Sequence, residues 1–170
     1  MIYVVVATKS EAQGVAEHLK LIKSKLYGYT AFTSDELVVL VSGVGIEAMS
    51  KATKTLMNDI KQDDTLVNIG ICASNHKVGT VFEISKIIYK DIIYELNKNS
   101  TLSIRCEDFE ATKKSHDIVD MESFGFYIAS NAHKNRFIYK VVSDNFEPQK
   151  VTKDETKKLI KRLIDESSCC

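Results

Sequence analysis

Ile118-Val119-Asp120-Met121-Glu122-Ser123 is the stretch that decides the fold, and Phe137-Ile138-Tyr139-Lys140-Val141-Val142-Ser143-Asp144 follows it as a second apolar run that ends in an acid. A buried strand delivers its last residue to the rim of a sheet, and ligands of α/β proteins bind beyond the carboxyl ends of the strands. The two stretches therefore predict a site to which Glu122 and Asp144 both contribute.

The two carboxylates have different predicted surroundings. Glu122 would lie near the positive end of a following helix and stay ionised. Asp144, just past an apolar strand, is expected to have its pKa raised by partial burial. These residues alone support a purely structural interpretation equally well, in which Glu122 is a first-turn helix acid and Asp144 is an N-cap or turn residue before Asn145.

The composition predicts one domain spanning residues 1–170, which is long enough to bury a core. Lys+Arg and Asp+Glu balance at 23 each, so no overall field attracts nucleic acid or an anionic membrane. There is no basic leader followed by an apolar run, and no apolar stretch reaches the roughly 20 residues that span a bilayer. We expect a cytoplasmic protein without nucleic-acid or membrane partners.

The cysteines and histidines predict neither a metal site nor a disulfide framework, because no CxxC spacing or histidine pattern accompanies them. Cys72 and Cys106 are expected to be buried, and Cys169-Cys170 to form a frayed tail. None of the scattered histidines has a partner at a catalytic spacing. They are His18, His76, His116 and His133.

The N-terminal region predicts a buried strand followed by a helix. Ile2–Val6 is a continuous β-branched run that suits a strand covered on both faces. Apolar residues then recur at helical spacing as far as Ile22, with Ser10 as the predicted N-cap. Glu11 is a first-turn acid that complements the helix dipole, and it also lies just beyond the first strand, where a sheet protein places a working carboxylate.

A glycine pair follows the next predicted strands, residues 27–33 and Leu37–Val41. The second strand runs into Ser42-Gly43-Val44-Gly45 and then into a helical pattern that extends to Ile60. Such a junction brings backbone N–H groups close to an anion or a sugar hydroxyl. A tight turn alone also explains the glycines, since the third glycine of a dinucleotide fingerprint and the Lys-Ser/Thr of a P-loop are absent.

The second half predicts further strands at residues 65–69, 81–93 and 101–106. Phe109 stands among acids in the next loop, where it would plug the edge of the core or stack on a ligand ring, and the plug is favoured. Residues 123–133 and 153–164 have helical spacing, and Pro148 lies in the loop before the second of these helices. Alternating strands and helices predict a three-layer α/β domain.

Taken in this order, the segments resemble the nucleoside phosphorylase and nucleosidase superfamily, and most closely a shortened methylthioadenosine/S-adenosylhomocysteine nucleosidase. The resemblance implies a three-layer α/β/α domain around a central mixed, largely parallel twisted sheet, and a homodimer. It rests on residues 5–11 (VVATKSE), 41–45 (VSGVG), 67–70 (VNIG), 77–79 (KVG), 120–122 (DME) and 142–144 (VSD).

The resemblance implies a role for each matching residue. Glu11 corresponds to the carboxylate that deprotonates the attacking water, and Asp144 to the acid that protonates N7 of the departing purine. Met121 and Glu122 correspond to the ribose-binding pair, and Phe109 to the aromatic that stacks on the base. The expected substrate-binding set also contains Ser143, Lys140 and Gly43.

The expected reaction is hydrolysis of the N-ribosidic bond, without metal or cofactor. A proton near N7 neutralises the leaving purine, which makes an acid at Asp144 useful. The phosphorylases of the superfamily bind phosphate with arginines, but Arg105, Arg136 and Arg162 lie elsewhere in this sequence, and Glu11 would repel an anion. A phosphate-dependent phosphorylase stays the less favoured alternative.

Several departures leave a catalytically weakened nucleoside-binding protein as a further alternative. Residues 71–74 (ICAS) replace a small hydroxyl residue and glycines, and Lys140 replaces an arginine, which loses the planar fork. The interval from Gly79 to Met121 is much shorter than in typical members. We therefore expect that a helix and part of the loop over the substrate are missing.

Overall fold

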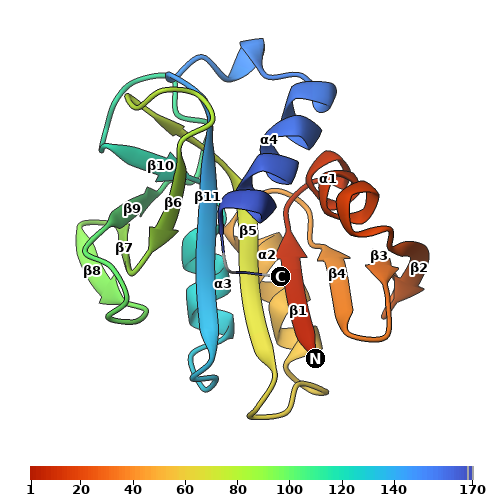
Figure 1. Cartoon of the computed structure of the whole chain (residues 1–170). Helices are drawn as coiled ribbons and strands as arrows, with labels where there is room; N and C mark the ends of the chain where they lie inside the picture. The colour runs from red at the N-terminus through yellow and green to blue at the C-terminus, as the bar shows by residue number, and fades with distance from the viewer. Residues whose placement is uncertain (168, 170) are drawn as a thin grey trace.

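A computed structural model describes residues 1–167 and 169 of the chain. Helices separate groups of strands along the chain, and one sheet runs through the middle of the domain (Figure 1). The strands are β1 Ile2–Val6, β2 Ile22–Leu26, β3 Tyr29–Thr33, β4 Leu37–Val41, β5 Thr65–Ser74, β6 Val81–Ile84, β7 Lys86–Tyr89, β8 Ile92–Glu95, β9 Ser103–Cys106, β10 Ile118–Asp120 and β11 Arg136–Asp144. The helices are α1 Lys9–Leu19, α2 Ile46–Leu56, α3 Ser123–Ala129 and α4 Lys153–Glu166, with a 3-10 turn η1 at Pro148–Lys150.

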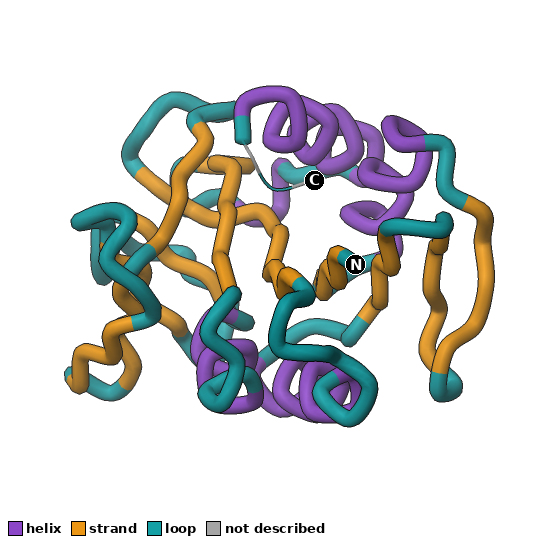
Figure 2. The backbone as a smooth tube through the Cα atoms, turned by 60° about the horizontal axis from the view of Figure 1, so that its bottom comes forward, coloured by secondary structure: helices purple, strands orange, loops and turns teal. Residues whose placement is uncertain are grey.

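The helices form two layers, one on each face of the sheet (Figure 2). Helices α1 and α4 pack together on one face, and α2 and α3 on the other. Side chains alternate between the faces along a strand, so Val4 and Val6 enter the core under α1 and α4 while Val5 enters the core under α2. The predicted three-layer α/β/α architecture is confirmed.

Strand β5 is the axis of the mixed sheet. It pairs in parallel with β1, from Ile2 opposite Thr65 to Val5 opposite Asn68, and in parallel with β11 along its other edge. Strand β4 also runs parallel to β1, whereas β2, β3, β6 and β8 join through antiparallel pairs. The carboxyl ends of β1, β4, β5 and β11 therefore meet at one edge of the sheet.

Strand β5 is twice as long as β1, so part of the edge of β5 extends beyond its pairing with β1. The pairing with β1 ends at Asn68, and antiparallel pairing with β10 begins at Ala73 on the same edge. Between these two residues that edge of β5 has no strand partner within residues 1–167 and 169. The gap leaves backbone groups of β5 available to side chains.

Several local predictions are wrong. Helix α2 ends at Leu56 and not at Ile60, and α3 ends at Ala129 and not at residue 133. Ile22 starts strand β2 and does not extend the first helix, which ends at Leu19 and is followed by a C-cap, Lys20, in the left-handed conformation. The N-cap of α1 is Thr8, not Ser10. The predicted single stretch 81–93 is divided into β6, β7 and β8, with a tight turn at Lys90 and Asp91, where φ is 47° and 62°.

The cysteines are distributed as predicted, with one exception. Cys72 and Cys106 are buried. Cys169 is also buried, where it packs beside α1 and α4 and its Sγ accepts a hydrogen bond from Ser167, so the frayed-tail prediction is wrong for this residue. Cys170 lies outside the described residues.

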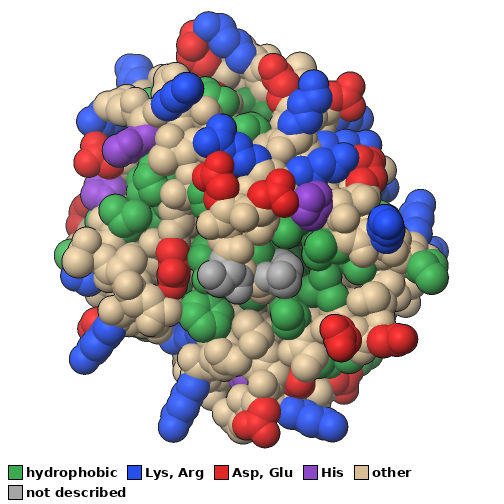
Figure 3. Space-filling model, viewed as in Figure 1, with side chains coloured by type: hydrophobic (Ala, Val, Ile, Leu, Met, Phe, Trp, Pro, Cys, Tyr) green, Lys and Arg blue, Asp and Glu red, His purple; other side chains and the backbone are tan. Residues whose placement is uncertain are grey.

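The surface carries both signs of charge. Lys and Arg side chains lie interspersed with Asp and Glu over the face viewed in Figure 3. None of the helices in the described part of the chain is both long and apolar enough to cross a membrane.

Candidate active site

A cavity of about 540 Å³ lies where the parallel strands end. This volume is in the range of small-molecule sites. Its walls come from the start of α1, the gap in β5, the end of β10, the end of β11 and the start of α4. Glu11, Glu122 and Asp144, which are far apart in the sequence, all line it, together with Met121 and Ser143.

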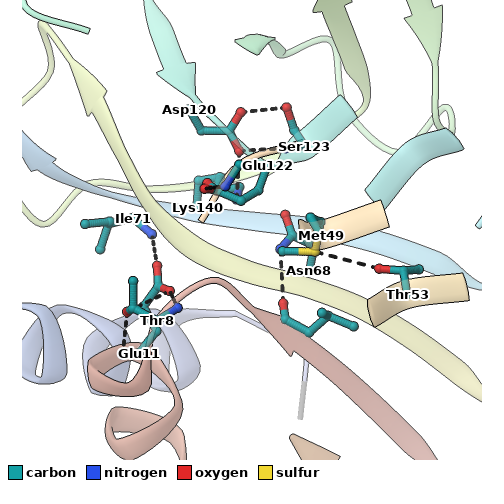
Figure 4. Close-up of polar contacts among 12 residues, drawn as sticks. Thr8, Glu11, Met49, Thr53, Asn68, Ile71, Asp120, Glu122, Ser123 and Lys140 are labelled. Carbon is teal, nitrogen blue, oxygen red and sulfur yellow. Dashed lines mark hydrogen bonds and ion pairs between the residues drawn. The ribbon is translucent and has the colours of Figure 1, made fainter. Parts of the chain in front are cut away.

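Glu11 is held by the two elements that meet beside it. Its Oε2 closes a capping box at the start of α1, where it accepts hydrogen bonds from the Thr8 N–H at 2.7 Å and the Thr8 hydroxyl at 3.0 Å. Its Oε1 accepts a hydrogen bond of 3.0 Å from the N–H of Ile71 in the gap of β5 (Figure 4). Glu11 is therefore fixed at the floor of the cavity and only 2% exposed.

Glu122 is held by the glycine turn between β4 and α2. Its Oε1 accepts a hydrogen bond of 2.9 Å from the N–H of Gly45, while the N–H of Gly43 donates to Ala7 O at 3.0 Å. The N–H of Gly45 is thus used by the protein's own Glu122 carboxyl group. Gly43 does not line the cavity and its amide is already paired, so the structure gives no support to the predicted contact between Gly43 and substrate.

Burial acts against the predicted ionisation of Glu122. Burial, followed by the negative charge of Asp120, raises the pKa of Glu122 to about 7, although Lys140 and the N–H of Gly45 act in the opposite direction. Glu122 occupies the N-cap position of α3, but its side chain makes no capping bond there. Desolvation therefore outweighs the helix dipole on which the prediction relied.

Asp144 is a turn residue, as the structural interpretation predicts, and it also lines the cavity. Its Oδ1 accepts a hydrogen bond of 2.8 Å from the N–H of Glu147, which fixes the turn after β11. Its Oδ2 accepts one of 2.7 Å from the Ser143 hydroxyl, which also lies 3.2 Å from Cys72 O. The ladder between β11 and β5 is irregular at this point, and the carboxyl group is buried on the cavity wall.

Asp120 is a buried acid of the site for which sequence reasoning assigned no role. Its Oδ2 lies 2.9 Å from Lys140 Nζ, and its two oxygens accept hydrogen bonds from the Ser123 hydroxyl at 2.6 Å and the Ser123 N–H at 3.0 Å (Figure 4). Lys140 is buried beside the cavity and does not line it. A lysine inside a continuous apolar strand requires a buried counter-ion, which is the signal that could have found Asp120.

Phe109 is the predicted site residue that lies farthest from its expected environment. Its side chain is 82% exposed and does not line the cavity, so the favoured core-plug interpretation is wrong. Its neighbours Glu110 and Ala111 line the cavity in its place. The described residues between β5 and β10 form only strands and loops, with no helix to hold this aromatic against the site.

The arginines have partners elsewhere. Arg105 pairs with Asp91, and Arg162 with Glu166, while Arg136 donates to Tyr127 O, and none of the three lines the cavity. Within residues 1–167 and 169, no group of three or more His, Cys, Asp or Glu side chains is arranged to hold a metal ion.

Comparison with known proteins identifies the fold. No family model matches the sequence, and no curated protein sequence matches it significantly. Among solved structures, the 5′-methylthioadenosine/S-adenosylhomocysteine nucleosidase from S. pneumoniae matches with a TM-score of 0.77 at 20% identity, over 96% of this chain and 95% of that chain. The corresponding nucleosidase from Colwellia psychrerythraea matches with a TM-score of 0.74 at 17% identity, over 96% of this chain and 94% of that chain. The futalosine hydrolase of Helicobacter pylori matches with a TM-score of 0.74 at 14% identity, over 98% of this chain and 97% of that chain. The chain therefore has the nucleoside phosphorylase/nucleosidase fold, as its sequence resemblance predicts.

Proposed function

We propose that the protein is a nucleosidase that hydrolyses the N-ribosidic bond of a purine nucleoside, and specifically of a 5′-thio-substituted adenosine such as methylthioadenosine or adenosylhomocysteine. One observation carries this proposal. Three carboxylates from α1, the start of α3 and the end of β11 converge on one cavity of suitable volume. Solved structures with the same fold include nucleosidases of that specificity.

Asp144 and Glu11 divide the proton transfers between them. In the proposed reaction the Asp144 carboxyl group donates a proton to N7 as the bond from C1′ to N9 breaks, and the base leaves as neutral adenine. Glu11 accepts a proton from the water whose oxygen bonds to C1′. The Thr8 and Ile71 hydrogen bonds orient Glu11 for that transfer in advance.

Glu122 and Met121 would hold the ribose. A carboxylate accepts hydrogen bonds from two neighbouring hydroxyls, and the Gly45 N–H fixes one of the Glu122 oxygens. Because the pKa of Glu122 is about 7, this contact is strongest above neutral pH. Holding the sugar keeps C1′ in register with Glu11 and Asp144.

Water is a better nucleophile for this site than phosphate. The buried part of the wall contains Glu11, Asp120, Glu122 and Asp144, and the arginines of the chain have partners elsewhere. Phosphate in this cavity would face several carboxylates without a guanidinium fork to bind it. Lys9 and Lys153 also line the cavity, at exposed positions, so the charge of the buried wall favours hydrolysis.

The second candidate function is nucleoside binding without turnover. Two observations favour it: Lys140 is paired with Asp120 beside the cavity, and Phe109 points to solvent. A protein that has lost the base-stacking contact could keep the ribose carboxylate and still bind nucleosides.

A homodimer would bury exposed apolar side chains near the cavity. Val44, on the cavity rim, is 57% exposed and Phe109 is 82% exposed. We expect light scattering after size-exclusion chromatography to give twice the mass of the chain. A mass equal to one chain would contradict this expectation.

Chromatographic detection of free adenine tests the proposal. The protein is incubated with methylthioadenosine, adenosylhomocysteine and adenosine, each with and without phosphate. We expect adenine in both conditions. Product that appears only with phosphate would make the protein a phosphorylase, and binding without product would make it a binding protein.

Asp144→Asn is the variant that checks the acid. It keeps an oxygen that can accept the Glu147 N–H but removes the transferable proton, so turnover should fall by roughly 10²-fold or more. Thermal unfolding of the variant is the control for folding. Full activity in a folded Asp144→Asn variant would remove Asp144 from the mechanism.

A further inference from the structure

The proposed reaction leaves one buried ion pair without a role. Asp120 and Lys140 lie 2.9 Å apart, and their side chains are each 1% exposed. Two charges removed from water are costly unless their geometry and remaining hydrogen bonds compensate for the lost solvation. The neighbours of this pair therefore show what it does.

Lys140 extends from β11 past β5 to reach Asp120 at the end of β10. In the ladder Lys140 lies opposite Gly70 of β5, whereas Asp120 ends β10, beyond the gap in β5. A Cβ on Gly70 would lie 3.0 Å from Lys140 Nζ and 3.2 Å from Glu11 Oε1. The ammonium group therefore passes over a residue that has no side chain, and it lies beside Glu11 as it contacts Asp120.

Asp120 also holds the turn that presents Glu122. The Ser123 N–H and hydroxyl both donate to Asp120, so its carboxylate closes the four-residue turn that carries Met121 and Glu122. The Asp120 carboxylate thus has two kinds of partner. It accepts hydrogen bonds from Ser123, which ends the turn that carries Glu122, and it pairs with the Lys140 ammonium group. Figure 4 shows Asp120, Lys140, Glu122 and Ser123 gathered in this way.

We propose that Asp120 is a positioning residue of the active site, which fixes the Glu122 turn and, together with Lys140, sets the balance of charge around the Glu122 carboxyl group. This inference rests on the proposed function, because it assigns Glu122 to substrate. Asp120 itself need not touch the substrate, and it acts through its two neighbours.

The groups that face Glu122 come from four elements and one loop. They are Asp120 of β10, Lys140 of β11, Glu11 of α1, Cys106 of β9 and the N–H of Gly45. Burial is the largest influence on the pKa of Glu122, and Asp120 and Lys140 are the next two, with opposite signs. Removing one member of the pair should therefore shift the ionisation of Glu122 in one direction, and removing the other should shift it in the opposite direction.

The test is the pH dependence of binding of a carbon-linked analogue of methylthioadenosine, which has no N-ribosidic bond to hydrolyse, measured by calorimetry from pH 5 to 9. Affinity should rise with pH as Glu122 ionises. Asp120→Asn removes a negative neighbour and should move the midpoint to lower pH, and Lys140→Met should move it to higher pH, each by about one unit or more. The double variant should lie between the two. Asp117→Asn, which removes an exposed partner of Lys114, is the matched control and should leave the midpoint unchanged.

Shifts in the same direction, or midpoints equal to that of the wild type, would overturn the inference. If Lys140→Met does not fold because Asp120 is left unpaired, the double variant replaces it, and its midpoint must lie above that of Asp120→Asn. The proposed function can fail separately, if the wild type neither binds nucleosides nor releases adenine. In that case, carbon NMR of the Glu122 carboxyl group still measures the two opposite shifts.

Discussion

Helices α1 and α4 begin with the same motif but meet different surroundings. Thr8 and Glu11 form a capping box, and Thr152 and Glu155 form another, with the same distance of 3.2 Å from the glutamate N–H to the threonine hydroxyl. In both helices Oε2 of the glutamate serves the cap. Only Glu11 also uses Oε1, which accepts from Ile71 in the sheet. A capping box thus fixes one oxygen of a glutamate carboxylate at the start of a helix. Whether that carboxylate belongs to a site depends on which element contacts its other oxygen.

The largest expected effect is a difference in adenine release between variants of Glu11 and Glu155. Glu11→Gln should reduce adenine release by roughly 10²–10⁴-fold, because an amide cannot accept a proton from water. Glu155→Gln should leave release within about twofold of the wild type, since Glu155 is exposed and does not line the cavity. Equal losses in the two variants would mean that the proposed role of Glu11 is only structural.

A third helix start extends the comparison, because Glu122 precedes α3 without capping it. Its folded pKa of about 7 lies above the ordinary value of 4.5, so the folded state binds more protons between these values and stability falls as pH rises through that window. Glu122→Gln removes the free-energy cost of ionising a buried carboxyl group in the folded state. We expect the free energy of unfolding to rise by about 3 kcal/mol at pH 8 and to change little at pH 4.

Urea unfolding at the two pH values measures this difference. Glu155→Gln is the control, because Glu155 is exposed and its pKa is lowered by the hydrogen bonds of Thr152. A Glu122→Gln variant that is less stable than the wild type at pH 8 would contradict the assigned effect of burial.

The contact between α1 and α4 gives a smaller effect. A Cβ on Gly14 would lie 2.9 Å from Ile160 Cβ and 3.0 Å from Lys157 O, so Gly14→Ala should push the helices apart at a cost of about 1–2 kcal/mol. Gln13→Ala, at an exposed position on the same helix, is the control. If Gly14→Ala is as stable as Gln13→Ala in urea unfolding, the packing argument is wrong.

The smallest expected effect comes from the caps themselves. Thr8→Ala and Thr152→Ala should each lower the free energy of unfolding by about 1 kcal/mol, because both remove a bond to a helix N–H. Only Thr8→Ala should also lower kcat/KM, by several-fold, since the Thr8 hydroxyl orients Glu11. Equal kcat/KM values for the two variants would show that the cap does not position the catalytic carboxylate.

The sequence predicted best the strands whose two faces are both covered. Ile2–Val6 and Leu37–Val41 have the predicted bounds, because continuous β-branched runs suit strands between two layers of helices. The positions of Glu11, Glu122 and Asp144 could be predicted for the same reason, since each follows such a strand or its neighbour. Their roles in catalysis stay predictions.

The exposed elements could not be predicted in the same way. Strand β2 has the sequence IKSKL, whose pattern is weak, and Ile22 also fits the spacing of the preceding helix. The location of Phe109 depends on a loop between β9 and β10, where local sequence does not specify what covers the side chain. The pair of Asp120 and Lys140 required tertiary information, because the two residues belong to strands that do not pair with each other.

The order of the elements along the chain has a consequence for synthesis on the ribosome. Strand β11 pairs with the far edge of β5, and α4 is the partner on which α1 packs, yet both come much later in the chain than β5 and α1. A nascent chain that has reached residue 130 already carries Glu11 and Glu122, but it lacks Lys140, Asp144 and one wall of the cavity. The surfaces of β5 and α1 that pack against α4 stay uncovered until α4 has been translated, and exposed apolar surface of this kind promotes aggregation.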